Sequence, residues 1–88
     1  MQLIIDLSQE EKLFLILKDK GKEIATHNWS GLFQLSETLL KNIDKFLKSQ
    51  KVKLKQIEKI KVIPSKKSIV STRIAKATAL GLKINYND

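Results

Sequence analysis

Residues 61–82, KVIPSKKSIVSTRIAKATALGL, read as an apolar strand, a short basic turn and a helix rich in small residues. Pro64 ends the strand because proline cannot donate to a sheet ladder, and Gly81 stands where a helix C-cap would. We predict a strand over 57–63 and a helix over 67–80. Many proteins hold a phosphate in such a strand-turn-helix unit, so this stretch raises the question of a nucleotide site.

A phosphate cradle needs close backbone approach, which is why such loops carry glycine. This turn and the helix before its predicted end contain none. Lys66 and Lys67 could still meet an anion at the helix N-terminus, although a solvated lysine pair is the simpler interpretation. Asp6 and Ser8, at the end of the first strand, complete the candidate nucleotide or anion set. Asp6 would hold magnesium through water, or would simply form a turn.

The first thirty residues predict an antiparallel meander of three strands. Residues 2–8 and 11–18 are short runs rich in Ile, Leu and Phe, and 23–29 form the third strand. Gly21 supplies the positive φ that a tight hairpin needs. The second strand is apolar on both faces, which predicts cover on both sides of the sheet.

The remaining chain adds two helices and two strands. Apolar residues over 32–47 follow the spacing of one helical stripe, with Ser30 as N-cap. Residues 82–86 predict a fifth strand. The order is therefore βββαβαβ, an α/β fold with a mixed sheet and right-handed crossovers, in a single domain over 1–88. Two helices are too few to cover both faces of the sheet. The simplest expectation is that a partner chain covers the remaining face.

The second helix carries two rows of interest. Ile69, Val70, Ile74 and Ala77 can face the sheet. A separate row is small at every fourth position, and it consists of Ser71, Ala75 and Ala79. Small residues let another helix axis come close. The row either meets a partner or lets this helix sit tightly on its own sheet or on the first helix.

The net charge of +8 is the electrostatic footprint of nucleic-acid binding. Arg73 is the one arginine among 17 basic residues, however, and readers of base edges depend on the bidentate arginine fork. The composition disfavours specific readout and leaves weak RNA contact open. The candidates for that contact are Lys51, Lys53, Lys55, Lys66 and Lys67.

Little in the sequence points to catalysis, a metal or a cofactor. There is no cysteine, and His27 has no second imidazole with which to share a metal; we expect it to be a half-buried packing residue. Ser36 and Glu37 have no nearby base or acid. We expect no cofactor and no metal site. The absence of a signal-peptide pattern and of a long apolar run predicts a cytoplasmic protein.

The order of motifs resembles the N-terminal lobe of the TsaB/YeaZ family, actin-like-fold (ribonuclease H-like) proteins that act with TsaD in the threonylcarbamoyladenosine modification of tRNA. LIIDLS (3–8) is similar to the family's I-D-T-S start, SETLLKNIDKFL (36–47) to its S-E-x-L-L-P-x-I-x-x-L-L helix, and IEKIKVI (57–63) to its L-x-x-I-x-V strand. The family's G-P-G-S-F-T-G-L-R-I-G corresponds to SKKSIVSTRIA (65–75), which lacks all four glycines.

The resemblance implies a non-catalytic partner that pairs through the two helices of this lobe, with TsaD or with another copy. We therefore expect a homodimer or a complex with a TsaD-like protein. The partner-binding candidates are Ser36, Leu40, Ser71, Ala75, Thr78 and Ala79. Two alternatives stay open: a composite actin-like ATPase formed by an oligomer with Asp6 on magnesium, and a basic RNA-associated protein.

Overall fold

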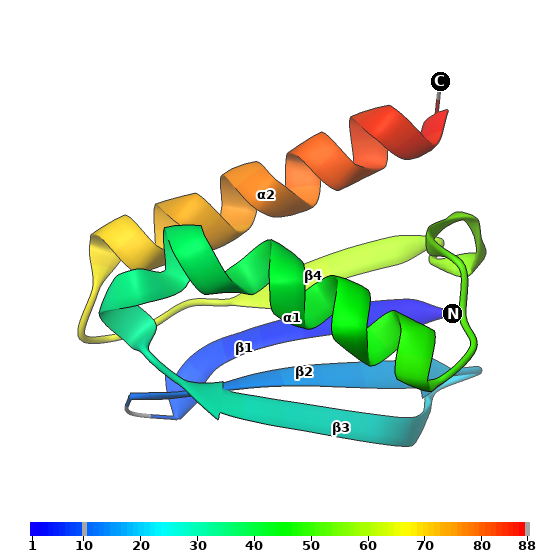
Figure 1. Ribbon diagram of the computed structural model, residues 1–88, viewed down its shortest axis with the longest axis horizontal. Coiled ribbons are helices and arrows are strands. Elements are labelled where there is room, and N and C mark those ends of the chain that lie inside the picture. Colours follow the sequence, from blue (N-terminus) through cyan, green and yellow to red (C-terminus); the bar gives the residue numbers. More distant parts are fainter. Residues whose placement is uncertain (10, 88) are drawn as a thin grey trace.

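Four strands form one mixed sheet in the described part of the chain, in the order β3-β2-β1-β4 (Figure 1). The computed structural model describes the backbone of residues 1–9 and 11–87, and the side chains of these as far as Leu82. The strands are β1 (Gln2–Gln9), β2 (Lys12–Asp19), β3 (Lys22–Ser30) and β4 (Lys59–Ile63). The predicted antiparallel meander is confirmed for β1, β2 and β3, and β4 lies parallel to β1.

The hairpin between β2 and β3 turns where the sequence predicts. Lys20 has φ 53° and Gly21 has φ 81°. Positive φ at two successive residues matches the right-handed twist of the flanking strands and makes a tight connection. Gly21 adopts this conformation at no steric cost, whereas Lys20 carries some strain.

The helical segments differ from the predictions at their ends. They are η1 (Leu32–Gln34), α1 (Leu35–Ser49), η2 (Leu54–Gln56) and α2 (Ile69–Asn87). Ser30 is the last residue of β3 and caps nothing. Gly31, at φ 120°, instead redirects the chain into the short turn η1, and no side chain caps it. The chain thus enters α1 through a 3₁₀ turn, a common way for a helix to begin.

The predicted fifth strand over 82–86 is wrong, because α2 continues through these residues to Asn87. Gly81 lies inside the helix and is no C-cap. A glycine costs a helix interior only about 1 kcal/mol relative to alanine, so it does not end a helix whose next turn still has a surface to pack on. Leu82 packs against the core. Within residues 1–9 and 11–87 the second predicted crossover is therefore absent, and the sheet has four strands.

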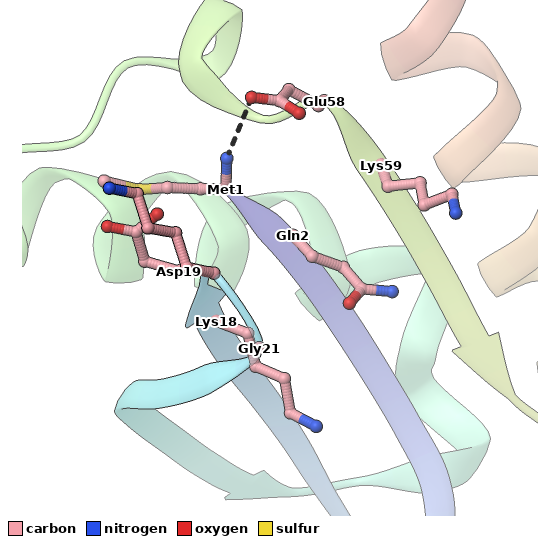
Figure 2. Close-up of a pocket in the computed structure, with 8 residues that line it drawn as sticks. Met1, Gln2, Lys18, Asp19, Gly21, Glu58 and Lys59 are labelled. Atoms are coloured by element: carbon pink, nitrogen blue, oxygen red, sulfur yellow. Dashed lines mark ion pairs between the residues drawn. The ribbon is translucent and has the colours of Figure 1, made fainter.

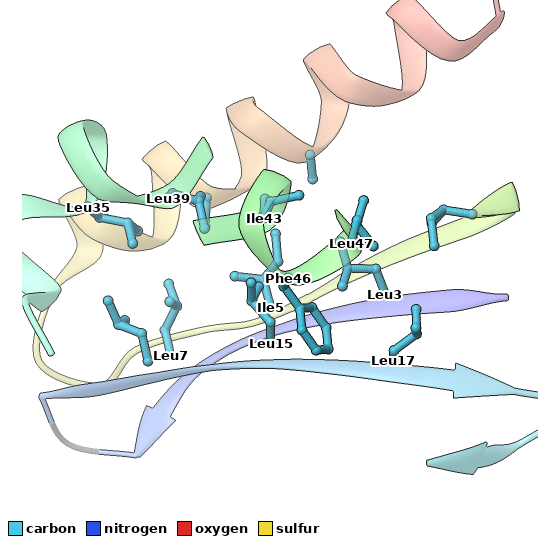
Figure 3. Packing of buried hydrophobic residues seen from close by; sticks show 14 of the residues in the cluster. Leu3, Ile5, Leu7, Leu15, Leu17, Leu35, Leu39, Ile43, Phe46 and Leu47 are labelled. Atoms are coloured by element: carbon cyan, nitrogen blue, oxygen red, sulfur yellow. The ribbon is translucent and has the colours of Figure 1, made fainter. Parts of the chain in front are cut away.

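Both long helices lie on the same face of the sheet (Figure 1). Successive side chains of a strand point to opposite faces. The buried positions of β2 alternate accordingly, whereas β1 is buried from Leu3 to Leu7 and contributes Leu3, Ile5 and Leu7 to the core. These residues and the inner stripe of α1 form one core (Figure 3). The core consists of Leu3, Ile5, Leu7, Leu13, Leu15, Leu17, Leu32, Leu35, Leu39, Ile43, Phe46, Leu47, Ile57, Ala75 and Ala79.

Polar and aromatic contacts attach α1 to the edge strand β3. Nε1 of Trp29 donates to Oγ1 of Thr38 over 3.1 Å, and Nε2 of His27 lies 2.8 Å from Oδ1 of Asn42. The His27 ring stacks between Trp29 and Phe46, with both centroid distances 5.8 Å. The prediction of His27 as a half-buried packing residue is confirmed.

The opposite face of the sheet carries no helix (Figure 1). Phe14 and Ile16 of β2 point to this side and are half-buried, while Ile4 of β1 is only 7% exposed. Neighbouring side chains on the sheet already shelter these apolar groups, so their burial does not require cover by a partner. None of the helices in the described residues is long and apolar enough to cross a bilayer.

Candidate functional site

The four residues predicted for a nucleotide or anion come together at one end of the sheet. Ser8, Lys66 and Lys67 line a shallow pocket of about 190 Å³, with Leu7 and Ser65. Asp6 is linked to the pocket through Ser8, whose Oγ donates to Asp6 Oδ1 over 2.6 Å. The parallel pairing of β1 with β4 produces this arrangement, because the carboxyl ends of parallel strands meet at one edge.

The carboxylate of Asp6 is engaged in local bonding. Its Oδ1 accepts the main-chain N–H of Ser8 over 2.9 Å, in addition to the hydroxyl of Ser8. Aspartate side chains that bond the backbone two residues on are typical turn-formers. Asp6 is 7% exposed, and among the described residues no group of three or more His, Cys, Asp or Glu side chains could hold a metal ion.

Four main-chain N–H groups at the start of α2, which could bind an anion, are bonded to side chains of the same segment. Ser65 Oγ accepts the N–H groups of Lys67 and Ser68, over 3.0 and 3.2 Å. Ser68 Oγ accepts the N–H of Ser71 over 3.0 Å, and Thr72 Oγ1 accepts the N–H of Ser65 over 3.0 Å. A phosphate cradle needs such donors unbonded, so the turn works here as a self-capped helix start.

The row of small residues on α2, predicted as a possible contact with another helix, faces the core of its own chain. Ser71, Ala75 and Ala79 are 2%, 0% and 8% exposed. Ser71 Oγ donates to the carbonyl oxygen of Leu32 over 2.6 Å, which holds α2 against the segment that precedes α1. Of the two alternatives for this row, the structure shows the tight packing of α2 on its own chain, and the three residues are not accessible to a partner.

The residues predicted to face the sheet from α2 point outward instead. Ile69 is 71% and Val70 66% exposed, and Ala77 is also exposed; only Ile74 packs against the core. The small residues face inward because small side chains let the axis of α2 approach the sheet and α1 closely. The larger residues at the neighbouring positions are thereby turned to solvent.

Large exposed apolar side chains gather on the helical layer. They define what we call the outer helix surface: Phe33, Leu40, Ile69, Val70 and Leu80, which are 69%, 57%, 71%, 66% and 61% exposed. Of the remaining partner-binding candidates, Ser36 is exposed and Thr78 half-buried. Of these five residues, only Leu40 was predicted from the sequence as a partner contact. A second apolar stripe at helical spacing, 69, 70, 77 and 80, was the signal that could have found the three on α2.

An apolar groove adjoins this surface between α1, the loop after it and α2. It has a volume of about 350 Å³, and its apolar lining is Leu40, Ile43, Leu47, Val52, Leu54 and Leu82. Lys48 and Asp44 lie at the groove and pair over 3.0 Å. Leu40 belongs both to the groove and to the outer helix surface, so the two are continuous.

A third hollow, of about 500 Å³, lies at the opposite end of the sheet (Figure 2). Gln2, Lys18 and Lys59 come to it from three adjacent strands, together with the hairpin turn. The α-amino group of Met1 lies 3.5 Å from a carboxylate oxygen of Glu58 and donates to the carbonyl oxygen of Gln56 over 3.1 Å. This hollow could not be predicted from the sequence, because only the strand register brings its lysines together.

Comparison with known proteins gives a fold likeness. No protein-family model matches the sequence, and no curated protein matches it significantly. Among solved structures, YeaZ from Pseudomonas aeruginosa superposes with a TM-score of 0.79 at 22% identity. A second, described as "an uncharacterized protein with similarity to peptidase YEAZ from Pseudomonas aeruginosa", gives the same values. Each match covers 98% of this chain and 39% of the other, so the chain has the fold of a part of YeaZ.

Proposed function

We propose that this chain is a non-catalytic protein-protein interaction module of the TsaB/YeaZ type, which pairs through its outer helix surface with a second copy or with a TsaD-like protein. The observation that carries the proposal is the exposure of Phe33, Leu40, Ile69, Val70 and Leu80 on the helical layer. Large apolar side chains left exposed on one layer of a soluble domain are typical of an interaction surface.

The physical basis of the pairing is burial of these side chains. Removing a Val, Leu, Ile or Phe side chain from water contributes about 1.5–3 kcal/mol, so burial of several can offset the entropy lost on association. The groove beside Leu40 offers a recess of about 350 Å³ for an apolar side chain of the partner. At many interfaces, a few anchor side chains that fill pockets of the other chain contribute most of the binding free energy.

The role as a partner rather than an enzyme is supported by the anion pocket. The N–H groups of Lys67 and Ser68 are bonded to Ser65, and Asp6 is held by Ser8. The resemblance of the motif order to the TsaB/YeaZ family, together with the fold of a part of YeaZ, supports helix-mediated pairing with TsaD or with itself. The tRNA modification that TsaD carries out would then be the process served.

The test is a measurement of mass in solution with matched variants. Sedimentation velocity from about 10 to about 500 μM covers the range in which a weak dimer exchanges with monomers. Val70→Glu and Leu80→Glu should each raise the dimer dissociation constant at least about tenfold, because they place a charge in the apolar contact. Ile24→Glu is the control: Ile24 is also a large apolar residue, 50% exposed, but it lies on β3.

A co-purification with tagged TsaD from the same source distinguishes the two partners. If the chain pairs with TsaD, the Val70→Glu and Leu80→Glu variants should lose capture and Ile24→Glu should keep it. A chain that stays monomeric throughout the concentration range and captures no TsaD would contradict the proposal. So would equal effects of all three substitutions.

A further inference from the structure

The sheet face turned away from the helices, which we call the open face, is basic at one end. Its residues follow from the strand alternation and register. They are Gln2, Ile4 and Asp6 of β1, Lys12, Phe14, Ile16 and Lys18 of β2, Glu23, Thr26 and Asn28 of β3, and Lys59, Lys61 and Ile63 of β4. The chemistry of this face differs from that of the helical layer.

Three lysines converge there from two strands that flank β1. Gln2 is aligned with Lys18 on β2 and with Lys59 on β4, and Ile4 is aligned with Lys61. Figure 2 shows Gln2, Lys18 and Lys59 side by side along the hollow. Neighbouring strands lie about 4.8 Å apart, so the backbones of β2 and β4 are separated by about 10 Å across β1. Lysine side chains are long and flexible, so the three ammonium groups can reach toward one another across β1.

The charge of these lysines is not neutralised within the chain. Among the residues that the structure describes, Lys18, Lys59 and Lys61 form no ion pair. The carboxylates nearby are Asp19, Glu23 and Glu58, and Glu58 pairs with the Met1 amino group. Lys20 and Lys22, in the adjoining hairpin, add further positive charge. An excess of positive charge at this end attracts an anionic ligand, and the net charge of +8 adds to that attraction at long range.

The distribution of apolar exposure decides between a protein and a polyanion as the occupant. Of the six large apolar side chains exposed in the described residues, five form the outer helix surface and the sixth is Ile24. The apolar residues of the open face are not among them, and Ile4 is 7% exposed. A protein partner would gain little apolar burial there. An extended polyanion would gain from the release of its counterions.

We infer that the open face binds the phosphate backbone of single-stranded nucleic acid. Lysines follow a backbone as point charges without reading base edges. Phe14, half-buried in the middle of the face, offers a ring on which a base can stack. Asn28 is aligned with Phe14, and Thr26 with Ile16; both are exposed and can bond to bases or sugars. The helices lie on the other side, so this binding is independent of the proposed pairing.

Fluorescence anisotropy with a 5′-labelled oligouridine, titrated with the full chain at several salt concentrations, tests the inference. For three phosphate contacts, log affinity should fall against log salt with a slope of about −2, that is, about −0.7 for each contact on a single strand. Lys18→Gln, Lys59→Gln and Lys61→Gln combined should weaken binding at least about tenfold at low salt and flatten the slope. Phe14→Leu should weaken binding without changing the slope.

The matched control removes three charges elsewhere. Lys41→Gln, Lys45→Gln and Lys76→Gln combined leave the same net charge, but these exposed lysines lie on α1 and α2. This triple variant should change affinity less than about threefold, because long-range attraction alone is lost. Equal losses in both triple variants would overturn the inference, as would no binding at low salt. Full displacement of the oligonucleotide by an equal charge concentration of polyglutamate would also overturn it.

Chemical-shift mapping gives an answer that does not depend on the folding of a variant. On addition of unlabelled oligouridine, the amide shifts of the native chain should concentrate on Gln2, Lys18, Lys59 and Lys61. Shifts confined to the helices or to the loop over 51–55 would contradict binding at the open face.

Discussion

The hydroxyl of Ser71 in α2 donates to the main-chain carbonyl oxygen of Leu32 over 2.6 Å, and both residues are buried. Through this contact the first turns of α2 are fixed to the segment that leads into α1, 39 residues earlier. The same hydroxyl accepts from Ser68 Oγ, so a short chain of hydroxyl groups connects the cap of α2 with the backbone of η1.

Replacement of Ser71 by alanine should lower the free energy of unfolding by about 1–3 kcal/mol, because it leaves the carbonyl oxygen of Leu32 buried without this donor. Urea denaturation followed by circular dichroism measures the change. Ser36→Ala, at an exposed position of α1, is the control and should stay within about 0.5 kcal/mol. Similar values for the two would show that the buried hydroxyl contributes little.

Replacement of Ala75 by leucine should also destabilise the fold, by about 1–3 kcal/mol, because a side chain at 0% exposure has no room for added carbons. Ala77→Leu on the same helix is the matched substitution, and its position is exposed. Thermal unfolding of both should separate them clearly. If Ala77→Leu were the more damaging of the two, α2 would have to be rotated relative to its observed position.

Two glycines should respond in opposite ways to alanine. Gly31 has φ 120°, and an added Cβ would lie 3.2 Å from Oε1 of Gln34, so Gly31→Ala should cost about 1–3 kcal/mol. Gly81 has no atom within 4 Å of an added Cβ and lies inside α2, so Gly81→Ala should stabilise by about 0.5–1 kcal/mol. Denaturant unfolding checks both. A destabilising Gly81→Ala would instead indicate a helix that ends there.

The contact between His27 and Asn42 should appear as a coupling energy. His27→Ala, Asn42→Ala and the double variant form a cycle whose interaction term should be about 0.5–1.5 kcal/mol, as expected for one hydrogen bond between side chains. A parallel cycle of Asn28→Ala with Asn42→Ala should give a term near zero, because Asn28 points to the open face. Coupling of equal size in both cycles would exclude a specific bond.

Addition of Mg-ATP or phosphate should leave the melting temperature of the native chain unchanged, because the N–H groups of Lys67 and Ser68 are already bonded to Ser65 Oγ. Ser65→Ala should cost about 1 kcal/mol by removing this cap. Differential scanning fluorimetry measures both effects. A clear stabilisation of the native chain by Mg-ATP would contradict this prediction and favour the alternative of a composite ATPase.

The alternation of apolar residues in the first strands, the Lys20-Gly21 turn and the stripe of α1 are local patterns, and each predicted its element correctly. They succeed because side chains on one strand face or one helix stripe share an environment whatever surrounds them. The resemblance to the TsaB/YeaZ family, drawn from the order of motifs, agrees with the fold likeness to YeaZ.

The side of α2 that would be buried could not be predicted in the same way. Its sequence offers two stripes, a small one at Ser71, Ala75 and Ala79 and a larger one at Ile69, Val70 and Leu80. Hydrophobicity favours the second, whereas the close approach of α1 and the sheet requires the first. The partner-binding residues predicted from the small stripe are therefore buried in the core. The exposed apolar residues of α2 belong to the larger stripe instead.

The α/β class, the meander and the absence of a glycine cradle could all be predicted from the sequence, because they depend on local periodicity and turn chemistry. The length of α2, the bonding of the Lys67 and Ser68 N–H groups before it, and the division into an apolar helical side and a basic open face could be seen only in the folded chain. These features depend on segments far apart in the chain: on the contact of Ser71 with Leu32, and on the strand alignment that places Lys18 and Lys59 on either side of β1.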